Sequence, residues 1–249
     1  MTTFPERFKE IHLAACDSTS DYLKKNIARL EADFPIMVSA AVQTAGRGRE
    51  SRAWISPENL GMYMTFGFHL PDKRGLSLLS IASGIAVCGM LQDWTGNEFA
   101  LKWPNDILAA GRKIAGILCE TIVKGDRIAC LVGIGINVNH RLDDFPPELR
   151  ERAGSLRLLT GREWPVAEGR ERLAASMAGW LRKLEAGRSA DILRRARALS
   201  RHFLGQPIAF HHQHRLWRGI FRGLAADGGL VLETEGGEKQ IFYSGEIAG

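Results

Sequence analysis

Residues 76–94 carry the pattern that most limits how this chain can fold: a helix whose apolar face is almost continuous. Such a helix needs cover on most of its sides, so it belongs in the core of a folded domain. No fully apolar run reaches the roughly 18 residues that a membrane span needs. The first residues carry charges where a signal peptide has its apolar region. We therefore expect a cytoplasmic protein without a membrane partner.

Short strands surround this helix along the chain. Apolar or aromatic runs bounded by turn residues predict strands at 36–42, 61–70, 99–102, 107–109, 113–123 and 127–136. Helical spacing predicts a helix over 20–33 and more helices between 147 and 202. Because the strands follow one another while the helices gather elsewhere, the pattern favours an α+β fold with a mixed or antiparallel sheet.

The end of the chain is β in character. Residues 206–249 hold four short strand candidates separated by glycine-rich turns, and Gly205-Gln-Pro207 ends the helical region before them. Several short strands in so small a segment pack most naturally as a small barrel. We predict two domains, residues 1–202 and residues 203–249.

The charge balance points to an anionic partner. The net charge is +5 and the pI about 9.2, and arginine supplies most of the excess. A basic surface of this kind suits nucleic acid, a nucleotide or an acidic protein.

Metal-binding patterns are weak in this sequence. The four cysteines are scattered without a CxxC pair, which favours buried free thiols over a disulfide or a zinc site. In a strand, His212 and His214 would share one face, but no third ligand accompanies them. We expect these histidines at an exposed turn or edge and assign no metal site.

The segment Gln43–Trp54, QTAGRGRESRAW, sets three arginines among small residues. Its glycines let the backbone approach a ligand closely, and guanidinium groups can fork onto carboxylate or phosphate oxygens. Trp54 could stack on a base, with Arg52 on the other face of the ring. From this segment alone, three interpretations stay open: an arm on nucleic acid, a loop that closes around a small anion, or a solvated turn.

A second polar segment, LKWPND, follows a predicted strand. The proline restricts the residue before it to extended geometry, so Lys102, Asn105 and Asp106 project where the strand ends. Read alone, this is either a phosphate-binding site or a plain turn with a salt-bridged lysine.

Two more segments predicted as strands contain glycine. In Gly111–Glu120, Lys113 heads an apolar strand and Gly116 leaves room for something beside it. Gly133–Asn139 is a strand that ends in amides. Glycine inside a strand often marks close approach by a ligand.

Taken together and in this order, these segments closely resemble the biotin protein ligases, also called biotin–[carboxyl carrier protein] ligases. The matched stretches are DST (17–19), QTAGRGRxxRxW (43–54), KWPND (102–106), GRKIAGILCE (111–120) and GIGIN (133–137). The ordered set is far more specific than any one motif. Residues 244–247 resemble, more weakly, the family's SH3-like C-terminal domain. The resemblance implies a catalytic domain similar to those of class II aminoacyl-tRNA synthetases.

The resemblance also implies an enzyme with two half-reactions. ATP and biotin give biotinyl-5′-AMP and pyrophosphate, and a lysine of a biotin carboxyl carrier protein then attacks the mixed anhydride. Because both the attacking carboxylate and the α-phosphate are anionic, cations must neutralise them. Mg²⁺ on the phosphates would contribute, and motif matching names four catalytic residues: Arg49, Lys102, Asp106 and Lys113.

Motif matching names the binding residues as well. Those expected to bind biotin are Ser18, Thr19, Ser20, Gln43, Gly46, Arg47, Lys113 and Gly116. Those expected to bind ATP or the adenylate are Arg47, Gly48, Arg49, Arg52, Trp54, Lys102, Asn105 and Asn137. Asp106 could orient Lys102, approach Mg²⁺ or accept a proton; we place orientation of Lys102 first, because the two residues are near neighbours.

The loop 44–53 is expected to act as a lid. Water hydrolyses an exposed acyl-adenylate, so a segment that orders over it would protect it. We expect the lid to be mobile without ligand and ordered with biotinyl-AMP. Two departures from the family pattern stand out: Glu50-Ser51 where Arg-Gly is usual, and Ser20 where Asn is common.

Two other functions compete. Lipoate or octanoate ligases share the catalytic fold, but their RRxSGGG-type loop is absent here. Some biotin ligases are also repressors with an N-terminal helix-turn-helix domain, for which 16 residues before Asp17 are too few. We therefore expect a ligase without a nucleic-acid partner, and its oligomeric state, monomer or homodimer, is left open.

Overall fold

A seven-stranded sheet lies at the centre of the fold. The computed structural model describes residues 7–71, 73–125, 127–213 and 215–248. The strands of this sheet are β1 (Lys9–Cys16), β2 (Ile36–Gln43), β3 (Gly61–Leu70), β4 (Ala100–Lys102), β5 (Asp106–Ala109), β6 (Arg112–Lys124) and β7 (Arg127–Asn137). Their order is β1-β2-β3-β7-β6-β5-β4, with only β1 and β2 parallel. The predicted mixed or antiparallel sheet of an α+β fold is thereby confirmed.

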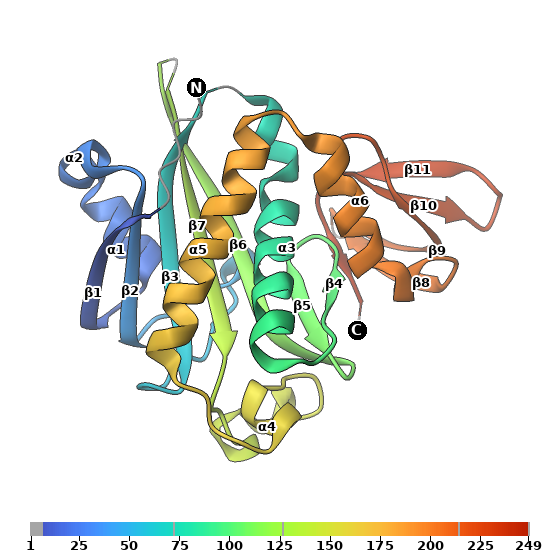
Figure 1. Ribbon diagram of the computed structural model, residues 1–249. Coiled ribbons are helices and arrows are strands. Elements are labelled where there is room, and N and C mark those ends of the chain that lie inside the picture. Colours follow the sequence, from blue (N-terminus) through green and yellow to red (C-terminus); the bar gives the residue numbers. More distant parts are fainter. Residues whose placement is uncertain (1–6, 72, 126, 214, 249) are drawn as a thin grey trace.

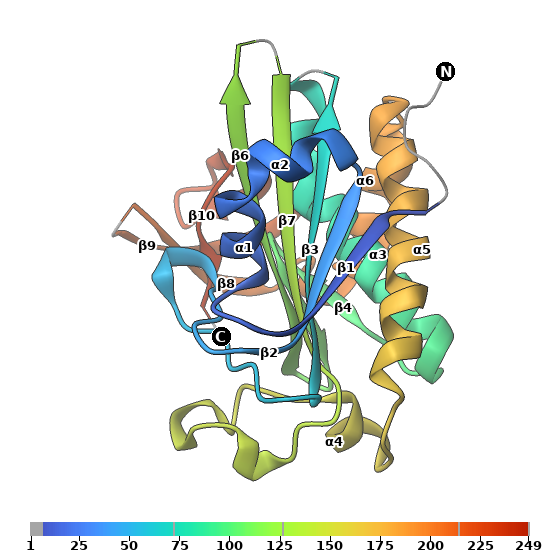
Figure 2. The same ribbon diagram turned by 90° about the vertical axis from the view of Figure 1, so that its left-hand side faces the viewer.

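The apolar helix α3 (Leu76–Thr95) lies against one face of this sheet. Helices α5 (Val166–Glu185) and α6 (Ser189–Leu199) lie on the same side, and α1 (Thr19–Lys25) and α2 (Ile27–Leu30) cover part of the other face (Figures 1 and 2). By length and composition α3 could cross a membrane, but 67% of its most apolar window is buried inside the protein. It is the core helix that the sequence predicts.

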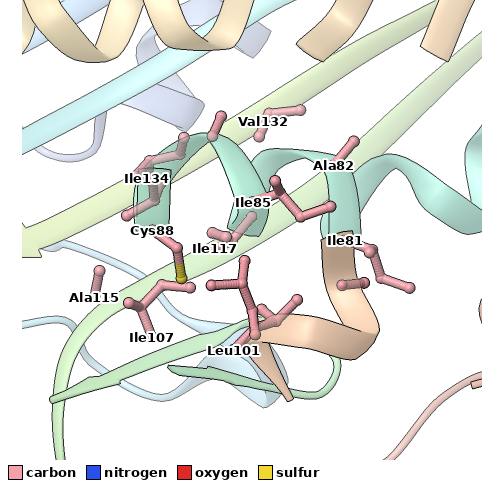
Figure 3. Close-up of a cluster of buried hydrophobic side chains, with 14 of the residues drawn as sticks. Ile81, Ala82, Ile85, Cys88, Leu101, Ile107, Ala115, Ile117, Val132 and Ile134 are labelled. Carbon is pink, nitrogen blue, oxygen red and sulfur yellow. The ribbon is translucent and has the colours of Figure 1, made fainter. Parts of the chain in front are cut away.

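Side chains of α3 form the centre of the core. Ile81, Ile85 and Cys88 point toward Ile107 and Ile117 of the sheet (Figure 3). All of these side chains are at most 2% exposed. The four cysteines are free thiols; Cys88 and Cys130 are buried, and the other two are partly exposed.

Two helical regions are more broken than predicted. The helix expected over 20–33 is split at Asn26, whose side-chain amide donates a 2.8 Å hydrogen bond to the carbonyl of Tyr22 and caps α1. The region 147–202 contains α4 (Leu156–Thr160), α5 and α6. Gly161 and Gly187, both with positive φ, end α4 and separate α5 from α6.

The C-terminal strands form a second, antiparallel sheet in the order β11-β10-β9-β8-β12. Their bounds are β8 (Pro207–His212), β9 (Arg215–Leu224), β10 (Leu230–Thr234), β11 (Lys239–Phe242) and β12 (Glu246–Ile247). This is consistent with the predicted SH3-like unit, although β12 was not predicted because two residues carry no periodicity. This sheet packs on the part of the chain that holds the seven-stranded sheet: Trp103 Nε1 donates a 3.0 Å hydrogen bond to the Gly228 carbonyl.

The histidine prediction is testable only in part. His212 lies at the end of β8, where its Nδ1 is 2.9 Å from the carbonyl oxygen of Ser244. His214 lies outside the described residues.

Candidate active site

The residues predicted to bind substrates gather around one cavity of about 430 Å³. The predicted residues that line it are Ser18, Thr19, Ser20, Gln43, Arg47, Gly48, Arg49, Arg52, Trp54, Lys102, Asn105, Asp106, Lys113, Gly116 and Asn137. Gly46 lies beneath this lining. Its carbonyl accepts a hydrogen bond from Trp54 N at 2.8 Å, and a Cβ at this position would sit 2.5 Å from the Trp54 carbonyl oxygen.

One end of the cavity is polar and tightly bonded. Gln43 Oε1 accepts hydrogen bonds from Thr19 N at 2.8 Å and Thr19 Oγ1 at 3.2 Å, while Gln43 Nε2 donates to Ser56 Oγ at 2.9 Å. Thr65 on β3 joins this network, with its Oγ1 2.8 Å from the hydroxyl of Thr19 and 2.9 Å from that of Ser20. Thr65 was not predicted, because nothing in an apolar strand sequence marks it. The network fixes the amide and hydroxyl groups that face the cavity.

Trp54 rests on a platform made by two glycines. Gly116 on β6 and Gly135 on β7 are cross-strand partners. A Cβ on Gly135 would lie 2.4 Å from the Trp54 ring, and one on Gly116 would lie 3.0 Å from it. The indole of Trp54 therefore fills part of the room beside Gly116; Gly116 also lines the cavity, and its contact with biotin stays a prediction. Trp54 Nε1 is buried without a hydrogen-bond partner.

Two lysines and one carboxylate stand beside this platform. Lys113 Nζ lies 2.6 Å from Asp106 Oδ1, in an ionic contact whose alignment is poor for a hydrogen bond. Lys102 faces Asp106 across the β4–β5 pair. Burial lowers the pKa of the Lys102 ammonium, and Asp106 acts in the opposite direction.

The ion pair corrects our first-ranked role for Asp106, because its close partner is Lys113 and not Lys102. The Asp106 carboxylate still lies opposite Lys102 in the β4–β5 pair, where it raises the pKa of the Lys102 ammonium against the larger lowering effect of burial.

The arginines of the loop are each held by a different partner. Arg47 pairs with Asp21 of α1. Arg49 donates from one nitrogen to Asn105 Oδ1 at 3.0 Å and to the Gly245 carbonyl at 2.9 Å. Arg52 forms a two-pronged pair with Glu246 on β12.

Arg52, predicted to lie on the face of the adenine opposite Trp54, is paired with Glu246 in the structure, and its contact with the adenine stays a prediction. The cation over the Trp54 ring is Lys113, whose Nζ is 5.6 Å from the ring centroid. Arg52 is directed instead to the C-terminal sheet, because Glu246 offers it a carboxylate.

Both predicted asparagines are anchored to backbone. Asn105 Nδ2 donates to the Ile117 carbonyl at 3.0 Å, and the buried Asn137 donates from Nδ2 to the Gly154 carbonyl at 2.9 Å. The residues that sequence reasoning missed, Gly135 and Glu246, also line the cavity. The glycine-thinned strand 133–139 was a signal for Gly135, whereas Glu246 has none except its place in the weak C-terminal match.

This α+β fold, with a basic loop beside a cavity at the start of α1, is that of a ligase family. The chain belongs to the biotin/lipoate A/B protein ligase family, whose model matches residues 13–138. A second model, the biotin protein ligase C terminal domain, matches residues 203–248.

Related proteins agree with this family. The biotin–[acetyl-CoA-carboxylase] ligase of Paracoccus denitrificans is 31% identical over 94% of this chain and 98% of its own length. The bifunctional ligase/repressor BirA of Bacillus spizizenii is 34% identical over 92% of this chain and 71% of its own. The structure of the Aquifex aeolicus biotin protein ligase in complex with biotin and ATP is 31% identical, with a TM-score of 0.78 over 96% of this chain and 97% of that one.

Proposed function

We infer that this protein is a biotin–[biotin carboxyl carrier protein] ligase. It uses ATP to activate biotin as biotinyl-5′-AMP and transfers the biotinyl group to a lysine of the carrier protein. The observation that carries this inference is the single cavity that joins a fixed amide-and-hydroxyl end to a cluster of lysines and arginines. Its relatives bear the names of ligases of this kind.

The basic end of the cavity suits the first half-reaction. The biotin carboxylate attacks the α-phosphate of ATP, a new C–O–P link forms, and pyrophosphate leaves. Lys102, Lys113 and Arg49 would bind the carboxylate and phosphate oxygens and stabilise the charge that develops on them. Arg47, now paired with Asp21, would exchange that partner for a ligand oxygen.

Mg²⁺ would neutralise phosphate charge when it is bound. Among the residues that the structure describes, no three His, Cys, Asp or Glu side chains are grouped to hold a metal ion. Phosphate oxygens suit Mg²⁺, which often keeps few protein ligands. We therefore assign the ion to the phosphates and give it no protein ligand.

The polar end suits the head group of biotin, a cyclic urea that both donates and accepts hydrogen bonds. Ser18, Thr19 and Ser20 at the start of α1, with Gln43 at the end of β2, would bind it. Trp54 on its glycine platform would contact the adenine with its ring. Asn105 and Asn137 would bind the adenine edge through the atoms that the backbone leaves open.

In the second half-reaction, the amine of the carrier lysine attacks the carbonyl carbon of the adenylate. An amide bond forms, AMP leaves with the electron pair of the C–O bond, and the amine nitrogen loses a proton to solvent. Asp106 would hold Lys113 against the departing phosphate through their 2.6 Å ion pair.

The lid would exclude water between the two steps. We propose that residues 44–53 are mobile without ligand and order over the intermediate. Equal protease sensitivity with and without biotinyl-AMP would contradict this.

We also propose a division of the chain into residues 1–202 and 203–249, and a cytoplasmic location. Nucleic acid is not proposed as a partner, since the loop arginines contact Asp21, Asn105, Gly245 and Glu246 and do not form an open basic strip. A gel shift with operator-like DNA tests that point. Whether the protein is a monomer or a homodimer is left to a measurement of mass in solution.

The activity assay is pyrophosphate release from ATP and Mg²⁺ with biotin, lipoate or octanoate added in turn. Release that depends on biotin is the expected result. Because the family model also covers lipoate ligases, release that depends on lipoate or octanoate alone would replace this function with theirs.

A further inference from the structure

Glu246 stands out because it places a carboxylate at an anion-binding cavity. It is contributed by β12 of the C-terminal sheet, 194 residues along the chain from Arg52. Besides Arg52, both Lys102 and Lys113 act on it and lower its pKa. A negative charge here repels phosphate, so its presence calls for a different explanation than substrate binding.

The contacts of Glu246 provide that explanation. Its oxygens accept two hydrogen bonds from the Arg52 guanidinium, at 2.9 and 2.5 Å, in the two-pronged geometry that fixes direction as well as distance. Glu50, at the position where the family pattern has Arg, brings a second carboxylate to 3.6 Å from the same guanidinium. Arg52 is thus held between an acidic residue of its own loop and one of the C-terminal sheet.

The neighbouring Gly245 holds a second arginine. Its carbonyl accepts the 2.9 Å hydrogen bond from Arg49, which also binds Asn105. Gly245 has φ 127°, and a Cβ there would lie 2.4 Å from the Phe210 ring. Only glycine lets the chain turn here and present both the Gly245 carbonyl and the Glu246 carboxylate to the loop.

The lid between these two arginines has an uncommon backbone. Glu50 and Ser51 have φ values of 53° and 58°, in the left-handed region that residues other than glycine seldom adopt. Such a conformation persists only where surrounding contacts hold it. The contacts on either side of it are those of Arg49 and Arg52 with Gly245 and Glu246.

We propose that Glu246 is a positioning residue that docks the lid onto the C-terminal sheet. It acts through Arg52 and needs no contact with biotin or ATP. Without ligand the lid opens and closes, and docking limits how often it opens. Docking thereby slows escape of the intermediate, a consequence that rests on the proposed function. The docking itself does not depend on which acid the enzyme activates.

The test compares two Arg–Glu pairs of the same sheet. Glu246→Gln keeps the size of the side chain and removes its charge. The matched control is Glu233→Gln, because Glu233 forms a two-pronged pair with Arg222 at 2.9 and 2.9 Å, with similar side-chain exposure of 25% against 31%. Hydrogen exchange of residues 44–54 is measured in the ligand-free chain. We expect it to rise about two- to fivefold in Glu246→Gln, the range for a partly exposed pair, and to stay unchanged in Glu233→Gln.

Unchanged lid exchange in Glu246→Gln, or an equal rise in both variants, would overturn the proposal. A second measurement follows release of biotinyl-AMP after excess ATP and biotin are removed. Release should be faster in Glu246→Gln, while the KM for biotin stays the same; a raised KM for biotin with unchanged release would assign Glu246 to substrate binding and overturn positioning. If no adenylate forms in the natural protein, the proposed function fails, and the exchange experiment still decides the docking role.

Discussion

Trp54 and Arg52 are two residues apart in the same loop, yet different forces hold them. The Trp54 ring lies on the cross-strand pair Gly116 and Gly135, where any added side chain would collide with it. Arg52, with 53% of its side chain exposed, is held against Glu246 by an ion pair with two hydrogen bonds. We call the first region the floor (Trp54, Gly116 and Gly135) and the second the rim (residues 47–52 with Glu246).

The difference between steric contacts in the floor and ion pairs in the rim shows how one site can keep a fixed shape and still admit its ligands. Steric contacts in the floor are short-ranged and almost insensitive to salt, so the floor keeps its shape through each turnover. Exposed ion pairs in the rim are weak, at about 0–1 kcal/mol each, and can be exchanged for phosphate oxygens. Changes to the floor should therefore have large effects, and changes to the rim small ones.

The largest effect is expected at Lys113, which lies over the Trp54 ring of the floor, acts electrostatically on Glu246 of the rim and pairs with Asp106. Lys113→Ala removes a cation from the reacting phosphate and leaves Asp106 without its partner. We expect kcat to fall by about 10²–10³-fold, as when one preorganised donor is lost. Initial rates of pyrophosphate release measure this. Lys183→Ala is the control, since Lys183 also lies over a tryptophan, Trp180, but does not line the cavity. Equal losses in the two variants would contradict the role of Lys113.

The second-largest effect is expected from acid, which should lower the free energy of unfolding through His140. His140 is buried and stacks on Phe145, a residue of the cavity lining, and burial lowers the pKa of its imidazole to about 4. The folded pKa lies below the ordinary 6.5, so the unfolded state takes up the proton first as the pH falls. The contribution of neutral His140 to the free energy of unfolding is complete above pH 6.5. About 3 kcal/mol of it is lost as the pH falls from 6.5 to 4.

Urea unfolding of the natural chain and of His140→Gln over this pH range checks the prediction. The difference in unfolding free energy between the two should shrink as the pH falls. A difference that is the same at every pH would show that His140 does not titrate as a buried neutral group.

A smaller effect is expected for Gly135→Ala. Its methyl group would meet the Trp54 ring at 2.4 Å, so the ring must move off the platform. Overpacking of this kind costs about 1–3 kcal/mol, and we expect weaker ATP binding by roughly tenfold or more. The control is Gly179→Ala in α5, where an added Cβ meets no atom within 4 Å. ATP binding by calorimetry that is equal in the two variants would remove Trp54 from the nucleotide site.

The smallest effect is expected at the rim. Ser51→Gly places at φ 58° the residue that adopts this conformation without a steric penalty. It should favour the docked lid by about 0.5–1 kcal/mol and lengthen retention of the adenylate two- to fivefold. Ala110→Gly, at φ 48° in the β5–β6 turn, relieves similar strain away from the lid and should leave retention unchanged. Longer retention of the adenylate in both variants would mean that relief of strain in the lid is not what lengthens retention.

The sequence predicted the floor and the rim unequally. Lys102, Lys113 and the loop arginines were found because charge beside glycine at a strand end can be read locally. The packing of Trp54 could not be predicted from local sequence, because it depends on the strand register that sets Gly116 opposite Gly135. Glu246 lies even further from its partner in sequence, and it stands on a two-residue strand too short to show a period.

The strands were predicted better than the helices for a similar reason. Long apolar runs such as Gly61–Leu70 identify themselves, and the structure has that strand with the predicted bounds. The break at Asn26 depends on one side-chain hydrogen bond, which helical periodicity does not reveal.

The most direct measurement of the central claim is the mass of a biotin carboxyl carrier domain after incubation with this protein, ATP, Mg²⁺ and biotin. Biotin, lipoate and octanoate are supplied in separate reactions with their matching carrier domains. We predict that the carrier gains one biotinyl group on its acceptor lysine, that the reaction needs ATP, and that Lys113→Ala abolishes most of it. A biotin carrier of unchanged mass, with lipoate or octanoate attached in the other reactions, would contradict the account.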